Sequence, residues 1–300
     1  MNSEKTESVI DLFCGAGGLG TGFSRYFPIT EAIDMNPDCC RTYSFNHAYT
    51  RVAERDIRNV DFGRQDFQGI LGMTGGPPCQ DYSRLNDTRD TNSERANLLF
   101  EMTRIILQVR PTWALIENVS SVPKKRKEQV TRTLSDAGYH VVSRVIFANQ
   151  FGSVQKRHRW MVTAHLDRPV YPESRNTSRV AGEILTGQPS DIHPKPRTLA
   201  ALKTLPSGHW VAIPGQTFKV YYVIDPRLPL PAIVNPTKLR YVRPDRTGYL
   251  SRQELEAAQG FPRTYRIFGN KDAWGKQLAN AVPVEMAEAF AESFKKIELN

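Results

Sequence analysis

The sequence predicts an α/β protein with a doubly wound, mostly parallel sheet and a small, loop-rich, basic second domain. Two observations lead to this prediction. Short apolar runs alternate with helical segments over the first half of the chain, and 13 of the 20 prolines lie between Pro169 and Pro262. Alternating strands and helices are typical of a parallel sheet that is covered by helices on both faces.

The expected strands are apolar runs bounded by glycine, proline or polar residues. They cover residues 8–13, 29–34, 69–74, 112–118, 140–148 and 159–165. Helices are expected at 20–27, 37–46, 98–109 and 198–205. Near the C-terminus, Ser251 and Glu254 have the spacing of a capping box that opens a helix. A strongly amphipathic final helix is expected over 280–296, with two lysines in its last turn.

The positive charge is concentrated in one third of the chain. The formal net charge is +9, and residues 151–250 hold 15 basic against 6 acidic residues, so the entire excess lies there. A localised basic field is typical of a protein that binds a polyanion, most often nucleic acid, and it is also compatible with an ordinary solvated surface.

Other features narrow the class of protein. No run of about 18 apolar residues occurs, and the start of the chain is polar, so we expect neither a membrane span nor a secretory signal. The four cysteines show neither C-x-x-C spacing nor a nearby histidine pair. We therefore predict no metal site and a reduced, cytoplasmic location.

A glycine-rich motif follows the first expected strand. Gly15, Gly17 and Gly20 match G-x-G-x-x-G between a strand and a helix, which is the context of a nucleotide cofactor. Asp34 ends the next strand, where it can accept from ribose hydroxyls, and Asp56 can accept from an adenine amino group. The motif itself leaves NAD and S-adenosylmethionine open, and a tight turn without ligand is the plainer alternative.

The stretch GGPPCQDYS places Cys79 directly after two prolines at the end of an expected strand. Pro77 and Pro78 each hold φ near −65°, and the carboxyl edge of such a sheet is where ligands bind. This setting suits a nucleophile that must approach a substrate at one angle, although most free cysteines are small buried hydrophobes. The polar segment 80–97 is long enough to be a mobile lid.

Charged residues cluster near two further strands. Glu117 and Asn118 end one strand, where a carboxylate can act as an acid or bind a ring nitrogen, and where a loop-tying pair is the common alternative. Arg157 and Arg159 lie at the start of another strand and point the same way. His158 between them faces the opposite side, and we do not expect it to act as a catalytic base.

Six sequence blocks occur in a specific order. They are DLFCGAGGLGTGF, GGPPCQDYS, IENV, QKRHR, RQELEAAQGFP and NAVPV. Together they resemble the DNA cytosine-C5 methyltransferases of the bacterial and phage restriction–modification type, over about residues 8–295. The resemblance implies a catalytic domain at 1–165 that binds S-adenosylmethionine in a Rossmann-like fold. It also implies a target-recognition domain at 166–250 and C-terminal helices at 251–300 that return to the first domain.

The resemblance also implies the chemistry and its residues. A cytosine flipped from double-stranded DNA would be attacked at C6 by Cys79 and methylated at C5, with S-adenosylhomocysteine as the other product. Glu117 would hold N3, Arg159 would contact O2 and a phosphate, and Arg157 would orient Glu117. The implied cofactor-binding residues are Phe13, Gly15, Gly17, Asp34, Met35, Asp56, Ile57, Pro78, Leu98, Asn280 and Val282.

Some features depart from the family pattern and leave alternatives open. Ala279 stands where the family usually has glycine, and only about residues 209–229 remain as variable recognition sequence, which predicts a short target. An RNA (tRNA) cytosine-C5 methyltransferase is one alternative, but its Cys-Phe-Thr signature is absent here. A catalytically inactive nucleic-acid-binding relative and an NAD-dependent oxidoreductase are the others. The expected partners are double-stranded DNA and a separately acting restriction endonuclease, with the enzyme a monomer near the nucleoid.

Overall fold

The computed structural model describes residues 6–63, 67, 69–78, 94–175, 179–188, 190, 193–213 and 220–299, with only the backbone described for Thr6 and for residues 94–96. Cys79 and most of the segment 80–97 lie outside the described residues. The position and the role expected for Cys79 therefore stay a prediction.

Seven strands form the central sheet in the order β3-β2-β1-β4-β5-β8-β6. Neighbouring strands pair in parallel except around β8, which runs antiparallel to both β5 and β6. The strands are β1 (Thr6–Leu12), β2 (Ile29–Asp34), β3 (Arg51–Glu54), β4 (Ile70–Gly75), β5 (Trp113–Val119), β6 (His140–Phe147) and β8 (His158–His165). The predicted doubly wound, mostly parallel α/β fold is confirmed.

The order of the strands places a topological switch point between β1 and β4. The chain moves from β1 outward to β2 and β3, and from β4 outward to β5 on the other side. Leu12 pairs with Gly75, and Gly75 pairs with Ile116, so the carboxyl ends of β1, β4 and β5 are level. The loops that follow these strands open at one edge, which is where sheets of this kind bind ligands.

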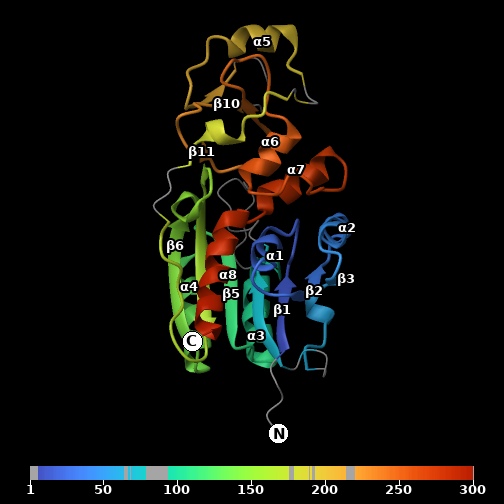
Figure 1. Cartoon of the computed structure of the whole chain (residues 1–300), viewed down its shortest axis with the longest axis vertical. Coiled ribbons are helices and arrows are strands. Elements are labelled where there is room, and N and C mark those ends of the chain that lie inside the picture. Colours follow the sequence, from blue (N-terminus) through green and yellow to red (C-terminus); the bar gives the residue numbers. More distant parts are fainter. Residues whose placement is uncertain are drawn as a thin grey trace.

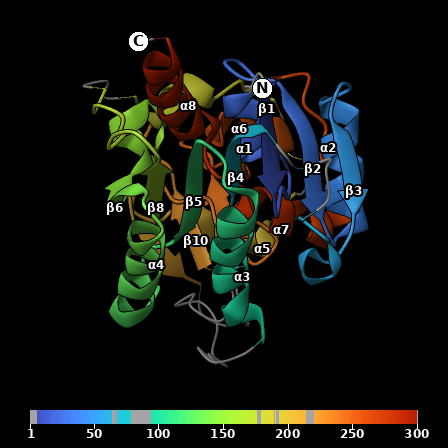
Figure 2. The same ribbon diagram turned by 90° about the horizontal axis from the view of Figure 1, so that it is seen from below.

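Helices cover both faces of the sheet. Helices α3 and α4 lie on one face, and α1 and α8 lie on the other, as the two views show (Figure 1, Figure 2). The bounds are α1 (Gly18–Phe23), α2 (Pro37–Asn46), α3 (Glu94–Val109), α4 (Lys124–Asp136) and α8 (Val284–Glu298). Phe294 of α8 stacks on Trp113 of β5 with ring centroids 4.4 Å apart. Burying each such ring stabilises the fold by roughly 1.5–3 kcal/mol, which holds the last helix against the first part of the chain.

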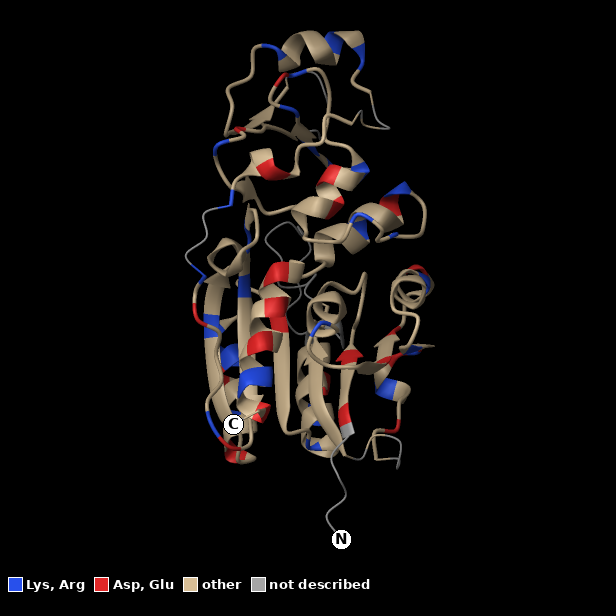
Figure 3. Ribbon diagram, viewed as in Figure 1, with Lys and Arg blue, Asp and Glu red and all other residues tan. Residues whose placement is uncertain are grey.

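Most of the basic third of the chain forms a smaller unit at the top of Figure 1, although β8 within it belongs to the central sheet. The three-stranded sheet of the smaller unit has the order β12-β10-β9, and a further short strand, β11, pairs with β7 from the larger unit. The bounds are β7 (Gln155–Lys156), α5 (Pro196–Leu202), β9 (Trp210–Ala212), β10 (Val220–Val223), β11 (Leu230–Pro231) and β12 (Leu239–Val242). Among the described residues, 3₁₀ turns include Ile57–Asn59, Ala148–Phe151 and Ala181–Ile184. Figure 3 shows basic positions around α5 and along the loops of this unit.

Helices α6 (Arg252–Ala258) and α7 (Lys271–Asn280) lie between the two units (Figure 1). The predicted capping box is present, because Ser251 Oγ accepts the Glu254 N–H at 3.2 Å and a Glu254 oxygen accepts the Ser251 N–H at 2.9 Å. The final helix starts at Val284, four residues later than predicted, because residue 280 still ends α7 and Pro283 caps the next helix. The domain boundaries at 165 and 250 stay predictions. Among the described helices none is both long and apolar enough to cross a membrane.

Candidate active site

The glycine-rich loop after β1 has an unusual backbone. Phe13, Gly15 and Gly17 all have positive φ, at 54°, 52° and 80°. Glycine adopts this left-handed region without strain, whereas a side chain such as that of Phe13 adopts it only where the surroundings impose it. The Gly15 N–H donates to Asp34 at 2.9 Å, which ties the loop to the end of β2.

The carboxyl ends of β2 and β3 carry three further residues that the sequence analysis proposed for cofactor binding, Asp34, Met35 and Asp56. Burial raises the pKa of Asp34, and backbone N–H groups that donate to the carboxylate oppose this shift. Met35 next to it is 63% exposed. Asp56 follows β3, where its ion pair with Arg58, at 2.6 Å, lowers its pKa. Because β1, β2 and β3 are parallel neighbours, all of these side chains lie at one edge.

The remaining expected cofactor residues lie on either side of this edge. Ile57 and Leu98 are buried in one apolar cluster, against which Phe13 packs. Val282 is buried on the other side, and a Cβ built on Gly18 would overlap its carbonyl oxygen and lie 2.9 Å from its nitrogen. Asn280 is exposed at the end of α7, and Pro78 is half-buried at the last residue described before Cys79.

Tyr265 supports the glycine-rich loop from behind, and the sequence analysis missed it. Its hydroxyl donates to the Ala16 carbonyl at 2.6 Å, although the two residues are 249 positions apart. Its ring stacks on Phe261 with centroids 4.4 Å apart, and a Cβ on Gly17 would overlap its hydroxyl. The available signal was an aromatic residue three positions after the end of the RQELEAAQGFP block.

Glu117 lies two residues before the end of β5 and forms an ion pair with Arg159, with 2.5 Å between Oε1 and Nε. The carboxylate is buried, and burial raises its pKa, while the positive charges of Arg159 and Arg157 oppose this shift. A Cβ on Gly76 would lie 3.0 Å from the second carboxylate oxygen, so Glu117 faces the loop that leads to Cys79.

Asn118 holds the double-proline loop in place. Its side-chain amide donates to the Pro77 carbonyl at 3.1 Å, and its oxygen accepts the Val119 N–H at 2.8 Å. The end of β5 therefore positions both Glu117 and the chain immediately before Cys79. The loop-tying role that the sequence allowed as an alternative for this pair applies to the asparagine.

Arg157 and Arg159 have different partners. Arg157 is 2% exposed, and its guanidinium donates to the carbonyl of Ile233 at 2.6 Å and to the carbonyl of Ala279. It thus ties the smaller unit and the end of α7 to β8, and it is Arg159 that contacts Glu117. His158 faces the other way, with its ring 4.1 Å from that of Phe147, as predicted.

Comparison with known proteins agrees with this arrangement. The family model described as C-5 cytosine-specific DNA methylase matches residues 8–207 and 197–296. The type II methyltransferase M.HgiDI of Herpetosiphon aurantiacus is 28% identical over 308 residues, which cover 95% of this chain and 93% of the relative. The type II methyltransferase M.NgoPII of Neisseria gonorrhoeae is 26% identical, with 96% of this chain and 95% of the relative covered.

Solved structures share the fold at lower identity. A candidate DNA modification methyltransferase from an E. coli prophage superposes with a TM-score of 0.78 at 20% identity, covering 98% of this chain and 99% of that one. The S. pombe Dnmt2 methyltransferase gives a TM-score of 0.73 at 18% identity, with the same coverage. Both curated relatives are type II methyltransferases, which disfavours an NAD-dependent oxidoreductase. The chain belongs to the family of C-5 cytosine-specific DNA methylases and is a DNA cytosine-5-methyltransferase of the restriction–modification type.

Proposed function

We propose that this enzyme methylates C5 of a cytosine flipped out of double-stranded DNA, within a short specific sequence, through a covalent bond between Cys79 and C6. The observation that carries the proposal is the buried Glu117–Arg159 pair, which faces the double-proline loop leading to Cys79. A cytosine ring placed between these groups would meet a nucleophile on one side and a group able to hold a proton at N3 on the other.

S-adenosylmethionine is the proposed methyl donor, and the residues at the edge of the sheet fit it. Each oxygen of Asp34 accepts one backbone N–H, which leaves acceptor positions for ribose hydroxyls. Gly15 and Gly17 let the backbone approach the ligand closely, while Phe13 and Met35 offer apolar surface at the same edge. Asp56, Ile57, Pro78, Leu98, Asn280 and Val282 complete the proposed set.

The proposed roles of the chain follow from charge and proton balance. The Cys79 thiolate adds to C6 while Glu117 delivers a proton to N3, so that a neutral enamine with a nucleophilic C5 forms instead of an anionic ring. Burial raises the pKa of Glu117, which favours the protonated form that this role requires. When bound, S-adenosylmethionine supplies the electrophilic methyl group that C5 accepts. Loss of the C5 proton to water and return of the N3 proton to Glu117 then release Cys79 as thiolate and restore the aromatic ring.

Arg159 is proposed to act on both the cytosine and Glu117. Its Nε lies beside the Glu117 carboxylate, and one terminal nitrogen donates to the His158 carbonyl at 2.7 Å. The guanidinium has five N–H donors, so others can reach the cytosine O2 or a phosphate. Arg157 is proposed as a positioning residue, because its hydrogen bonds hold together the backbone segments that surround the site.

The wider biological setting is also a proposal. DNA as substrate places the enzyme in the cytoplasm of a prokaryotic or phage-infected cell, close to the nucleoid. The type II relatives favour a separately acting endonuclease of the same specificity as partner. A monomer suffices, since one chain supplies every residue proposed for one flipped base.

The direct test is methyl transfer from labelled S-adenosylmethionine to mixed-sequence duplex DNA, with the wild type and Cys79→Ser compared side by side. We expect label in 5-methylcytosine with the wild type and none with the variant, and sequencing of the product then identifies the target site. Transfer to RNA but not to DNA would refute the proposed substrate. Undiminished transfer by Cys79→Ser would refute the covalent step.

Tyr265→Phe is expected to weaken binding of S-adenosylhomocysteine about three- to tenfold, because the Ala16 carbonyl loses its donor and the glycine loop its support. Tyr139→Phe is the matched control, since Tyr139 donates to the Pro111 carbonyl at 2.8 Å on another part of the sheet. Calorimetric titration of both variants measures the dissociation constants. Equal affinities would show that Tyr265 does not position the loop.

A further inference from the structure

A cavity of about 250 Å³ lies at the junction of β12, α6 and α7, away from the edge of the sheet that carries the active site. Three basic side chains line it, one from each of these elements: Arg240, Arg252 and Lys271. Two of them lie over aromatic rings, with Arg240 5.6 Å from the ring centroid of Tyr249 and Arg252 4.7 Å from that of Trp274. Contacts of this kind hold each guanidinium in place beside the cavity.

Arg240 is the unusual member of this group. It is only 7% exposed, and its guanidinium donates to the Pro236 carbonyl. Among the residues that the structure describes, none offers it a carboxylate within ion-pair distance, and burial lowers the pKa of Arg240. A buried charge without an opposite charge is costly, and such charges are normally paired or bound to a ligand.

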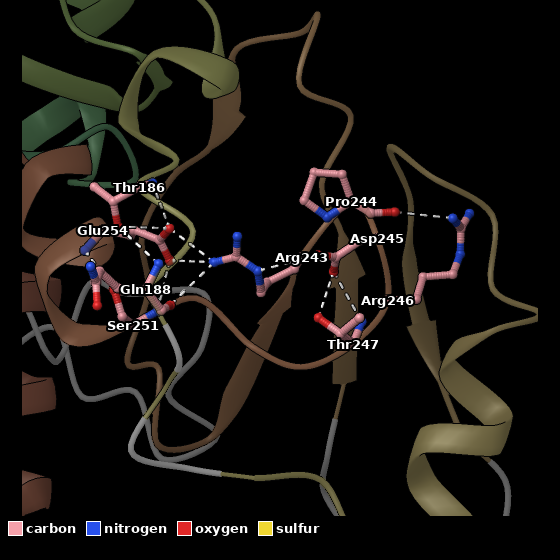
Figure 4. Close-up of polar contacts among 9 residues, drawn as sticks. All are labelled: Thr186, Gln188, Arg243, Pro244, Asp245, Arg246, Thr247, Ser251 and Glu254. Atoms are coloured by element: carbon pink, nitrogen blue, oxygen red, sulfur yellow. Dashed lines mark hydrogen bonds and ion pairs between the residues drawn. The ribbon is translucent and has the colours of Figure 1, made fainter.

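Arg243, three residues further on, shows the usual solution. It forms an ion pair with the fully buried Glu254 at 2.9 Å, and Glu254 also accepts N–H groups from Thr186 and Ser251 (Figure 4). Arg243 is therefore part of the framework, whereas Arg240 faces the cavity. Glu256 is half-buried, accepts the indole N–H of Trp274 and interacts with the charge of Arg252, but it is not among the lining residues of the cavity.

We propose that the cavity lined by Arg240, Arg252 and Lys271 binds a phosphate group of the DNA backbone. This inference rests on the proposed function for the identity of the ligand. Three basic side chains from three separate elements line the cavity, and none of the lining residues that the structure describes carries a carboxylate, which suits a phosphate oxyanion. Of the three charges, Arg240 belongs to the basic third of the chain, residues 151–250, and Arg252 and Lys271 lie after it.

Helix α7 connects this cavity to the active site. Lys271 begins the helix, and Ala279 near its end accepts from Arg157, two residues before Arg159. At a rise of 1.5 Å per residue the two positions are about 12 Å apart. That distance corresponds to roughly three to four base pairs at 3.4 Å each, so a duplex that places a cytosine at Glu117 can reach the cavity.

The test is the salt dependence of DNA binding by the full chain, with Arg240→Met as the variant. Methionine keeps the apolar stem and removes the charge, so we expect a stability equal to or above that of the wild type. We expect the slope of log affinity against log salt concentration to fall by about 0.9, the value for one lost phosphate contact. The loss in affinity should be equal on target and non-target duplexes, because a phosphate carries no sequence information.

Arg227→Gln is the matched control. It removes one positive charge from the same unit, at a side chain that is 85% exposed and pairs with Asp225. We expect its slope to equal that of the wild type, because the charge is already compensated and does not line the cavity. An Arg240→Met slope equal to that of Arg227→Gln would overturn the proposal.

The alternative ligand for the cavity is a free phosphate ion, which has the same chemistry as a phosphate group of the DNA backbone. If millimolar inorganic phosphate raises the unfolding temperature of the wild type but not of Arg240→Met, while the DNA slope is unchanged, the cavity binds a free anion and the DNA assignment is wrong. Failure of the proposed function can be distinguished from failure of the cavity proposal. In the first case the wild-type enzyme transfers no methyl group to DNA. The binding slope reports on the cavity in either case.

Discussion

Glu117→Gln is expected to lower the rate of methyl transfer by about 10²- to 10⁴-fold while the chain stays folded. The amide is the same size as the carboxyl group, and its N–H can donate a hydrogen bond to N3 of cytosine, but it is too weak an acid to transfer a proton. The measurement is the single-turnover rate with enzyme in excess over duplex DNA, which separates chemistry from product release.

Glu285→Gln is the control for this prediction. Glu285 also pairs with an arginine, Arg179, at 3.0 Å, and burial also raises its pKa, but it lies on α8 away from the site. The control variant should have the same methyl-transfer rate as the wild type and a free energy of unfolding similar to that of the wild type. A Glu117→Gln rate within about threefold of the wild type, far below the range for general acid catalysis, would show that Glu117 does not hold N3.

Gly18→Ala is expected to lower the free energy of unfolding by about 3 kcal/mol and to abolish cofactor binding. The added Cβ would overlap the backbone carbonyl of Val282, and backbone atoms on both sides leave no flexible side chain to move aside. Helix α1 would have to separate from the segment before α8, which would displace the glycine-rich loop. Urea unfolding and titration with S-adenosylhomocysteine measure the two effects.

Gly248→Ala tests whether the effect is specific to this position. No atom lies within 4 Å of a Cβ built on Gly248, and its φ is not positive. We expect a change in stability within about 0.5 kcal/mol, as for ordinary surface substitutions. If the two alanine variants were equally stable, close packing of α1 on Val282 would not be what requires glycine at position 18.

The elements that the sequence predicted best are those with strong local signals. Strand β2 and helix α2 coincide with the predicted residues, because Asn36 caps the helix by accepting two backbone N–H groups and Pro37 occupies its first turn. The capping box at Ser251 is another such signal, since it depends on residues only three positions apart.

The missed elements lack such signals. Strand β3 has four residues and β9 has three, too few for alternation to stand out. Helix α4 was not predicted, because it begins with the charged residues Lys124–Lys127 and buries only Val130 and Leu134. Tertiary packing against the sheet, rather than an apolar stripe, forms this helix.

The sequence by itself determined the fold class, the family and the residue types of the site, because each depends on short motifs in a set order. Only the tertiary structure decided which partner each charge has. Arg157 and Arg159 are equivalent in local pattern, yet one binds carbonyl groups 76 and 122 positions away and the other pairs with Glu117. The physical reason is that burial and long-range hydrogen bonds depend on how distant segments pack, which a local pattern does not encode.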